Sequence, residues 1–404
     1  MLIVRHALLI TLLFASQADA SSLAAEARSI LGADQGVYVE TSNGTSLLAQ
    51  QAQKPVHPAS VSKVPTTLAL LRKLGPDYRF VTTFSAQGAV SEGTLHGNLL
   101  VQSNGDPAFV DENALLVADR LREAGVTQVT GDLKLQGYMT FDWLPDEDGS
   151  RLRRALAGSV SPAALAAARA FELESPSGPA PDQLLPTGIR FLAGGAQPTP
   201  VSSLVRPLLI HRSQPLLPLA KSLNDYSNNI FKPLADAAGG AAAVEAVARS
   251  AVPTAMQSEI TLGDGAGTDP TNRLSPRAAV KLLRALEAEL KKSGNGLTDI
   301  LPVAGIDDGT LRRRLDGPDE VGRVVGKTGT YGDYGASALV GAIPTSDRGT
   351  VYFAILNHGV PVPEARKRQD RFVRALLQQL SSVPWSYQRD VRPAIARAEI
   401  SVAK

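Results

Sequence analysis

Hydrophobic residues recur along this chain with two periods, one typical of helices and the other typical of strands. Leu68, Leu70 and Leu71 lie on one face of residues 61–75, which predicts a helix that ends at a Gly-Pro stop signal. The same kind of periodicity predicts further helices over residues 111–124, 214–238, 275–293 and 363–380.

Short apolar runs bounded by turn residues predict strands. Residues 323–330 and 338–343 are expected to form two antiparallel strands joined by a Gly-rich turn, with residues 352–357 as a third strand. Residues 94–102 and 126–136 are expected to form strands before and after the helix between them. Helices packed on an antiparallel sheet, with a helical cluster beside them, make an α+β fold.

The first twenty residues differ from the rest of the chain. Arg5 supplies a positive start, residues 7–15 form an apolar run, and Ala18-Asp19-Ala20 is a small-x-small cleavage site. This pattern predicts a secretory signal peptide over residues 1–20. The apolar run is too short to span a bilayer as a helix, and no other segment approaches the length needed. We therefore expect the mature chain in the periplasm, without a transmembrane anchor.

Composition narrows the function classes. The chain contains no cysteine, so its folded core must stabilise an exported protein without disulfides, and 404 residues are enough for two domains. The net charge of +2 argues against nucleic acid as a partner. The five histidines are scattered without metal-ligand spacing, and there is no Gly-rich phosphate loop. We expect neither a metal ion nor a cofactor.

Three short motifs carry the candidate chemistry. They are Ser60-Val61-Ser62-Lys63, then Ser227-Asn228-Asn229, then Lys327-Thr328-Gly329. Each motif alone is weak, since a chain of this length contains about one Ser-x-x-Lys by chance. In this order they are typical of the S-x-x-K, S-x-N and K-T-G set of serine enzymes that acylate on D-alanyl peptides or β-lactams.

The first motif offers a nucleophile and its base. Lys63 follows Ser60 by three residues, so on a helix both side chains project from one face. A lysine kept neutral by burial and by a second cation can take the serine proton, and Lys327 is the candidate for that cation. His57 is also near Ser60 in sequence, but no G-x-S-x-G accompanies it, which favours a loop histidine over a Ser-His-Asp triad.

The roles of the other two motifs depend on where their residues lie in helices and strands. Lys327 is expected near the end of a strand, where a cation and a hydroxyl suit a substrate that ends in a carboxylate, and Gly329 allows a peptide backbone to lie close. The second motif has two possible registers, because Tyr226-Ser227-Asn228 also fits Y-x-N, a form found in some β-lactamases. On a helix a shift of one residue rotates the side chain by about 100°, so the two registers exclude each other.

Further segments identify a resemblance. The chain resembles the serine-type D-alanyl-D-alanine carboxypeptidases/endopeptidases, penicillin-binding proteins that carry a domain inserted between the first two motifs. The resemblance covers nearly all of the mature chain and favours the S-x-N register. The segments that carry it, besides the motifs, are Gly36-Val37-Tyr38-Val39, Asn43-Gly44, Pro58-Ala59-Ser60, Leu74-Gly75-Pro76, Gly105-Asp106-Pro107, Asp264-Gly265-Ala266-Gly267 and Leu301-Pro302-Val303-Ala304-Gly305.

This resemblance implies a β-lactamase/transpeptidase-like catalytic domain with an inserted smaller α/β domain. The expected boundaries are residues 21–83 and 205–404 for the catalytic domain and 84–204 for the insert, which contains a loop at 175–181. The implied partners are peptidoglycan stem peptides and β-lactam antibiotics. Asp106 and Asp264 are implied to be turn and packing residues. The implied catalytic residues are Ser60, Lys63, Ser227, Asn229 and Lys327, and the implied substrate-binding residues are Thr328, Gly329 and Thr330, with the N–H groups of Ser60 and Thr330 as the oxyanion hole.

The chain departs from the family pattern in places that bear on substrate detail. Ala266 replaces the usual serine of the D-G-S-G segment, Lys232-Pro233 breaks the usual acidic ending of the S-x-N helix, and the insert is short and Ala-rich. Two alternatives remain open. A serine β-lactamase is disfavoured because no E-x-x-L-N segment lies at a suitable place, and a non-catalytic wall-binding relative is disfavoured because all motif residues are intact.

Overall fold

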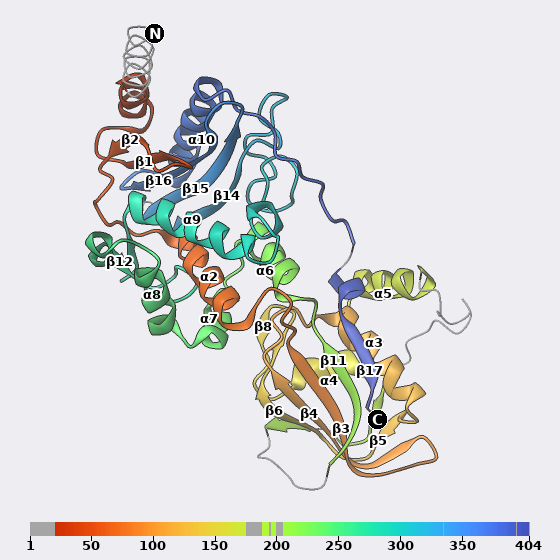
Figure 1. Cartoon of the computed structure of the whole chain (residues 1–404). Helices are drawn as coiled ribbons and strands as arrows, with labels where there is room; N and C mark the ends of the chain where they lie inside the picture. The colour runs from red at the N-terminus through yellow and green to blue at the C-terminus, as the bar shows by residue number, and fades with distance from the viewer. Residues whose placement is uncertain are drawn as a thin grey trace. The chain divides into compact units, whose positions relative to one another are not determined.

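The structure is a computed structural model that describes residues 21–174, 188–193, 195–198, 205–333, 335–392 and 394–403. The chain divides into two compact units, whose elements are labelled in Figure 1. Unit 1 contains the described residues up to Pro76 together with Ala220–Asp390. Unit 2 contains Asp77–Leu219 and the C-terminal residues from Val391 onward.

Unit 1 is built on a five-stranded antiparallel sheet in the order β14-β15-β16-β1-β2. The central strands are buried along most of their length, which is why their sequences are nearly continuous apolar runs. Strand β14, which carries the third motif, lies at an edge of this sheet. The strands are β1 (Gly36–Thr41), β2 (Ser46–Gln50), β14 (Val325–Tyr331), β15 (Ala336–Thr345) and β16 (Gly349–His358).

Helices cover both faces of this sheet because successive strand residues point to opposite sides. Phe353 packs in one core with Phe372 of α10, while Tyr352 donates a hydrogen bond to Glu287 of α9. Helix α2 packs against α7, α8 and α9 and forms the helical cluster with them. The helices of unit 1 are α2 (Lys63–Leu74), α7 (Phe231–Ala238), α8 (Ala241–Ser250), α9 (Pro276–Lys291) and α10 (Val362–Gln379), and α6 (Leu216–Asp225) runs in from unit 2.

Unit 2 has its own mixed sheet and its own core. Strands β3 and β4 form a hairpin. Strands β4 and β6 are parallel, so they need a crossover connection, and α3 lies in it. Phe84, Leu99 and Val117 belong to the core between the sheet and its helices. The main elements are β3 (Val81–Ser91), β4 (Thr94–Asn104), α3 (Asp111–Glu123), β6 (Leu133–Tyr138), α4 (Ser150–Leu156), α5 (Pro162–Glu174), β10 (Ala196–Pro198), β11 (Arg206–Arg212) and β17 (Glu399–Val402).

The boundaries of these units differ from the expected 84 and 204. Strand β11 pairs with β3 on one side and with β17 on the other, so two backbone ladders join the three strands. Residues 205–219 therefore belong to unit 2, and so does the C-terminal tail that was expected in the catalytic domain. In Figure 1 the blue strand β17 lies beside β11.

Most predicted elements of unit 1 are present with small shifts at their ends. The helix predicted over residues 61–75 is α2, preceded by the 3-10 turn η1 (Ala59–Ser62). The helix predicted over residues 214–238 is wrong in its middle, because a turn separates α6 from α7. The expected signal peptide and the loop at 175–181 lie outside the described residues. Within the described ranges, no helix is both long and apolar enough to cross a membrane.

Candidate active site

Ser60 and Lys63 meet at the start of α2. The Lys63 Nζ donates to Ser60 Oγ at 2.7 Å, to the Ala266 carbonyl oxygen at 2.6 Å and to Asn229 Oδ1 at 3.2 Å. Lys63 has no exposed surface, whereas Ser60 retains 8% of its surface. Three oxygens therefore surround one buried amine, and one of them is the hydroxyl of Ser60, a residue that keeps a small exposed surface.

Burial lowers the pKa of Lys63 to about 7, and the Asp264 carboxylate opposes this shift. Burial is one of the two causes that we expected, whereas the other, the charge of Lys327, does not contribute to this shift. Asp264 itself accepts hydrogen bonds from the backbone N–H groups of Gly267 at 2.7 Å and Thr268 at 2.9 Å. It thereby shapes the loop whose Ala266 carbonyl reaches Lys63, which agrees with a role in the scaffold.

Two glycines allow other segments to approach the nucleophile closely. Gly267 has φ +84°, and a Cβ there would lie 1.9 Å from the carbonyl oxygen of Ala59. A Cβ on Gly329 would lie 2.7 Å from the carbonyl oxygen of Pro58. We expected Gly329 to make room for a substrate backbone, and the structure shows that it also makes room for the chain just before Ser60. Ala59 has φ +49°, so the backbone before the nucleophile is strained.

The second motif lies in the turn between α6 and α7. Ser227 has φ +54°, and its Oγ accepts a hydrogen bond from Lys327 Nζ at 2.8 Å. Asn228 Oδ1 accepts the N–H of Ile230 at 2.9 Å and so supports the start of α7. Tyr226 is 62% exposed. The expected helical geometry is wrong here, but the turn directs Ser227 to Lys327 and Asn229 to Lys63, which favours the S-x-N register.

The third motif places side chains on both sides of strand β14. Lys327 has no exposed surface, and its Nζ also donates to the Thr328 carbonyl oxygen at 3.0 Å. Burial and the charge of Lys63 lower the pKa of Lys327 well below its usual value. Thr328 Oγ1 donates to Thr310 Oγ1 at 2.9 Å. Thr330 is exposed, and its Oγ1 accepts a hydrogen bond from Arg366 of α10 at 2.8 Å.

Sequence reasoning missed the residues that hold the Ser227 turn in place. The Asp225 carbonyl oxygen accepts the N–H of Thr310 at 2.8 Å, and a Cβ on Gly309 would lie only 2.0 Å from that oxygen. Lys221 donates to Asp307 Oδ2 and to the Leu301 carbonyl oxygen, both at 2.6 Å. The segment that begins with Leu-Pro-Val-Ala-Gly therefore supports the second motif, a role that no local pattern indicates.

His57 is not arranged as a base for Ser60. Its Nδ1 accepts the N–H of Ala59 at 3.1 Å, its Nε2 lies 2.9 Å from the Asp269 carbonyl oxygen, and its ring stacks on Tyr331 at 4.0 Å. Both ring nitrogens are thus engaged in the loop before η1. Among the residues that the structure describes, no three acidic, histidine or cysteine side chains form a group that could hold a metal ion.

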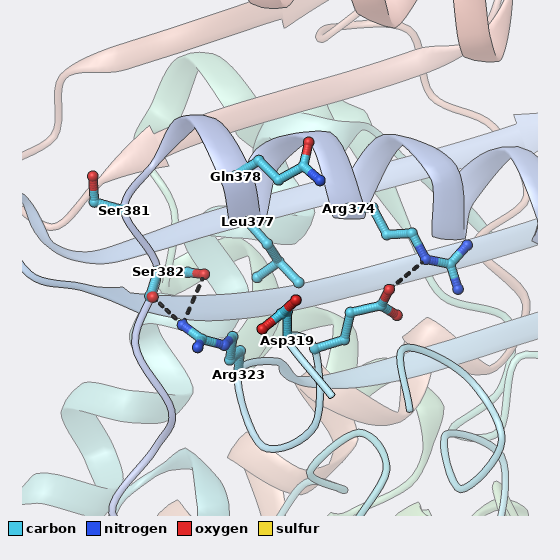
Figure 2. A pocket seen from close by; sticks show the side chains of 8 residues that line it. Asp319, Arg323, Arg374, Leu377, Gln378, Ser381 and Ser382 are labelled. Atoms are coloured by element: carbon cyan, nitrogen blue, oxygen red, sulfur yellow. Dashed lines mark hydrogen bonds and ion pairs between the residues drawn. The ribbon is translucent and has the colours of Figure 1, made fainter. Parts of the chain in front are cut away.

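A separate hollow lies beside α10 and contains no comparable arrangement. Figure 2 shows Arg323 directed to Ser382 and Arg374 on the opposite side of the hollow. Arg374 Nε contacts Glu320 Oε1 at 2.8 Å, so the charges pair with each other. No lysine is among the residues that line this hollow, so it offers no contact between a serine and a lysine like that of Ser60. The Ser60 site is therefore the candidate active site.

Most of the chain matches one known protein family. Residues 16–148 and 147–379 match the D-Ala-D-Ala carboxypeptidase 3 (S13) family. The chain belongs to this family. It is thus a serine peptidase, and the resemblance drawn from the sequence is confirmed.

Individual relatives span most of the chain. A carboxypeptidase DacB of Mycolicibacterium smegmatis is 29% identical over 378 residues, which cover 83% of this chain and 78% of the relative. A D-alanyl-D-alanine carboxypeptidase of an Actinomadura species is 26% identical over 433 residues, covering 83% of this chain and 79% of the relative.

Solved structures show the same fold. A predatory endopeptidase of Bdellovibrio bacteriovorus, acylated by penicillin G and bound to an immunity protein, superposes with a TM-score of 0.76 at 21% identity, covering 92% of this chain and 99% of that one. Penicillin-binding protein 4 of Haemophilus influenzae superposes with a TM-score of 0.63 at 20% identity, covering 90% of this chain and 100% of that one. The predicted α+β, penicillin-binding-protein-like fold is confirmed.

Proposed function

We propose that this S13 peptidase hydrolyses D-Ala-D-Ala peptides of peptidoglycan through an acyl-enzyme on Ser60. The observation that carries the proposal is the 2.7 Å contact between Ser60 Oγ and Lys63 Nζ, in a site where burial lowers the pKa of Lys63 to about 7. A neutral Lys63 amine offers its lone pair to the Ser60 proton, and the Oγ is then able to attack a carbonyl carbon.

The remaining residues complete the acylation step. The N–H groups of Ser60 and Thr330 donate to the oxygen that becomes negative as the Ser60 Oγ–carbon bond forms. When the carbon–nitrogen bond breaks, the leaving amine needs a proton. Ser227, which Lys327 contacts at 2.8 Å, supplies that proton and recovers one from the neighbouring amines. Water then cleaves the ester, and Lys63 accepts the water proton as it accepted the serine proton.

The same acylation accounts for two related activities. A β-lactam presents a reactive amide carbonyl to Ser60, and the leaving nitrogen stays attached to the adduct. A cross-linked stem peptide presents an amide whose leaving amine belongs to another peptide, which would make the enzyme an endopeptidase as well. The endopeptidase and penicillin-binding neighbours of the same fold support these extensions. We also propose export to the periplasm, because residues 1–20 have the pattern of a signal peptide.

Substitution of Ser60 tests the proposal and has a matched control two residues away. Ser60→Ala should abolish covalent labelling by fluorescent penicillin and hydrolysis of diacetyl-Lys-D-Ala-D-Ala, because no acyl-enzyme can form. Ser62 is fully buried, and its Oγ has no hydrogen-bond partner among the described residues, so Ser62→Ala should retain both activities. Mass spectrometry that locates the penicillin adduct on any residue other than Ser60 would overturn the assignment.

A further inference from the structure

Helix α10 holds an excess of positive charge. It carries five basic and two acidic side chains, a net charge of +3, whereas the whole chain has a net charge of +2. Its large apolar side chains, among them Phe372 and Leu376, are buried in the core of unit 1. Among the exposed residues of α10, all of which the structure describes, Pro363 is the one apolar residue. The charge is therefore carried by the face that points away from the core.

Two of the five cations have no partner in the protein. Arg366, Arg368 and Arg374 each contact an oxygen of another side chain. Lys367 and Arg371 are exposed and, among the described residues, have no hydrogen bond or ion pair. They are four residues apart on one face of the helix, where like charges repel each other. An anion held between them would relieve this repulsion.

Lys367 and Arg371 line a second hollow beside α10, of about 420 Å³. Its opposite wall is the end of the helical residues 21–31 and the turn that follows. Arg368 is used within the protein, since it contacts Glu364 at 2.8 Å and the Leu31 carbonyl oxygen at 3.5 Å. We call this site the basic hollow, and its lining includes Ser29, Gly32, Glu364, Lys367, Arg368 and Arg371. It offers two unpaired cations to an anion from outside.

The basic hollow lies close to the active-site strand but on another side of α10. Arg366, the residue before Lys367, contacts Thr330 near the end of β14. Lys367 and Arg371 follow Arg366 within about 8 Å along the helix axis and are rotated from it by about 100–140°. A long substrate that occupies the active site can therefore reach the basic hollow as well.

The exposure of the two cations indicates which kind of anion suits them. A single ion pair in water changes an affinity by only a few-fold, so a small anion is held weakly. A polymer that repeats its anionic groups makes several such contacts, because one bound group keeps its neighbours at a high local concentration. A membrane surface is a poorer fit, since a helix that lies on a bilayer needs exposed apolar side chains, and those of α10 are buried.

We propose that Lys367 and Arg371 in the basic hollow bind carboxylates of stem peptides that neighbour the one being cleaved. The hollow is then a second binding site for the polymeric substrate, and it favours peptidoglycan over short soluble peptides. This inference rests on the proposed function, which makes peptidoglycan the substrate.

Sedimentation with purified peptidoglycan tests the inference, in a Ser60→Ala background that prevents turnover. Lys367→Gln combined with Arg371→Gln should raise the Kd for peptidoglycan by about 3- to 10-fold at low salt. The difference should disappear near 1 M salt, where the screening length is about 3 Å. Peptidoglycan whose carboxylates have been amidated should bind the proteins with and without the two substitutions equally weakly.

Lys291→Gln combined with Lys292→Gln provides the matched control on α9. The side chains of these lysines are 64% and 69% exposed, and they pair with Glu287 at 3.0 Å and with Glu289 at 2.9 Å. The control removes the same net charge from another surface, so the Kd for peptidoglycan should change by less than about twofold. An equal rise of the Kd in both double variants would replace the basic hollow by a general charge effect and overturn the inference.

Activity separates the inference from the proposed function. With Ser60 intact, the Lys367→Gln and Arg371→Gln pair should slow hydrolysis of peptidoglycan at low concentration by about 3- to 10-fold. It should leave kcat/KM for diacetyl-Lys-D-Ala-D-Ala within about twofold, because this peptide has no neighbouring stem peptide.

Other outcomes contradict the inference in distinguishable ways. An unchanged Kd, or a loss of binding that persists on amidated peptidoglycan, would show that the inference is wrong while the proposed function stands. Binding of phosphatidylglycerol vesicles that the two substitutions abolish, with peptidoglycan binding unchanged, would assign the basic hollow to a membrane surface instead. If the unsubstituted enzyme hydrolyses neither the short peptide nor peptidoglycan, the proposed function fails and the inference fails with it.

Discussion

Each of the two units buries a pair of ionisable side chains, and the pairs have different surroundings. In unit 1 the pair is Lys63 and Lys327, and burial lowers the pKa of both. In unit 2 the pair is Asp106 and His211, whose Oδ2 and Nδ1 lie 3.8 Å apart. Burial raises the pKa of Asp106 to about 7 and lowers that of His211 to about 3. Both pairs are therefore shifted toward their uncharged forms.

The partners of the two pairs differ, and only the pair in unit 1 lies in the candidate active site. In unit 1 each lysine contacts a serine hydroxyl, at 2.7 and 2.8 Å. In unit 2 Asp106 accepts the N–H of Ala108 at 2.9 Å, as a turn residue does, and His211 Nε2 lies 3.2 Å from Asn113 Nδ2. Among the residues that the structure describes, neither group has a hydrogen bond to a hydroxyl. A shifted pKa thus marks burial in both units, and chemistry depends on what the shifted group touches.

Among the substitutions that test this comparison, removal of the base Lys63 should have the largest effect, which is on the acylation rate. With a pKa of about 7, Lys63 is protonated at lower pH and cannot accept the Ser60 proton, so penicillin acylation should slow about tenfold for each pH unit below 7. Lys63→Gln should be slower by roughly 10⁴ at pH 8, the upper end for a lost general base, and should lack this pH dependence. Stopped-flow acylation rates between pH 5 and 9 provide the measurement.

His57 supplies the control for that experiment, since it is the other titratable group close to the nucleophile in sequence. His57→Asn should retain the rise in acylation rate toward pH 7, because both ring nitrogens are used in the loop before η1. Disappearance of the rise in His57→Asn, together with its survival in Lys63→Gln, would assign the base to His57.

The second contact between a lysine and a serine should have a smaller effect. Ser227→Ala removes the hydroxyl that Lys327 contacts and should slow peptide hydrolysis by about 10²–10³, as expected for a lost proton-transfer group. Tyr226→Phe should leave the rate nearly unchanged because Tyr226 is 62% exposed. Steady-state kinetics on diacetyl-Lys-D-Ala-D-Ala separate the two. The reverse ranking of the variants would restore the Y-x-N register.

The sequence predicted those parts of the site that depend on local spacing. Lys63 follows Ser60 by three residues, and a helix start is enough to bring the two side chains together. Strands β14, β15 and β16 could also be predicted from the sequence, because continuous apolar runs mark buried strands. The family segments pointed to the correct scaffold even where their purpose was not apparent.

Other features depend on tertiary partners and were not predictable. Arg366 meets Thr330 across 36 positions of sequence, through the packing of α10 on the sheet. The turn at Ser227 interrupts a pattern that is periodic enough for one long helix, since apolar residues are buried in both α6 and α7. Strand β17 belongs to unit 2 because it pairs with β11. It has only four residues, and a hydrophobic pattern of that length is too short to predict the pairing.

The smallest effect is expected in the buried pair of unit 2, and it concerns stability. Asp106 keeps its proton in the folded chain up to about pH 7, whereas in the unfolded chain it loses the proton near its ordinary pKa of 3.8. The folded state binds more protons between these values, so Asp106 makes the free energy of unfolding fall as pH rises from 4 to 7. His211 acts in the opposite direction between pH 3 and 6.5, because only the unfolded chain takes up its proton there.

Asp106→Asn removes the first of these two dependences and keeps an oxygen for the N–H of Ala108. The unfolding free energy of the variant minus that of the unsubstituted protein should therefore rise by about 1–3 kcal/mol from pH 5 to pH 8. The chain has two tryptophans, Trp143 in unit 2 and Trp385 in unit 1, so urea unfolding in a Trp385→Phe background reports on unit 2 through Trp143 fluorescence. An unfolding free-energy difference that stays constant between the two pH values would show that Asp106 is already ionised in the folded unit, and the comparison between the two buried pairs would then fail.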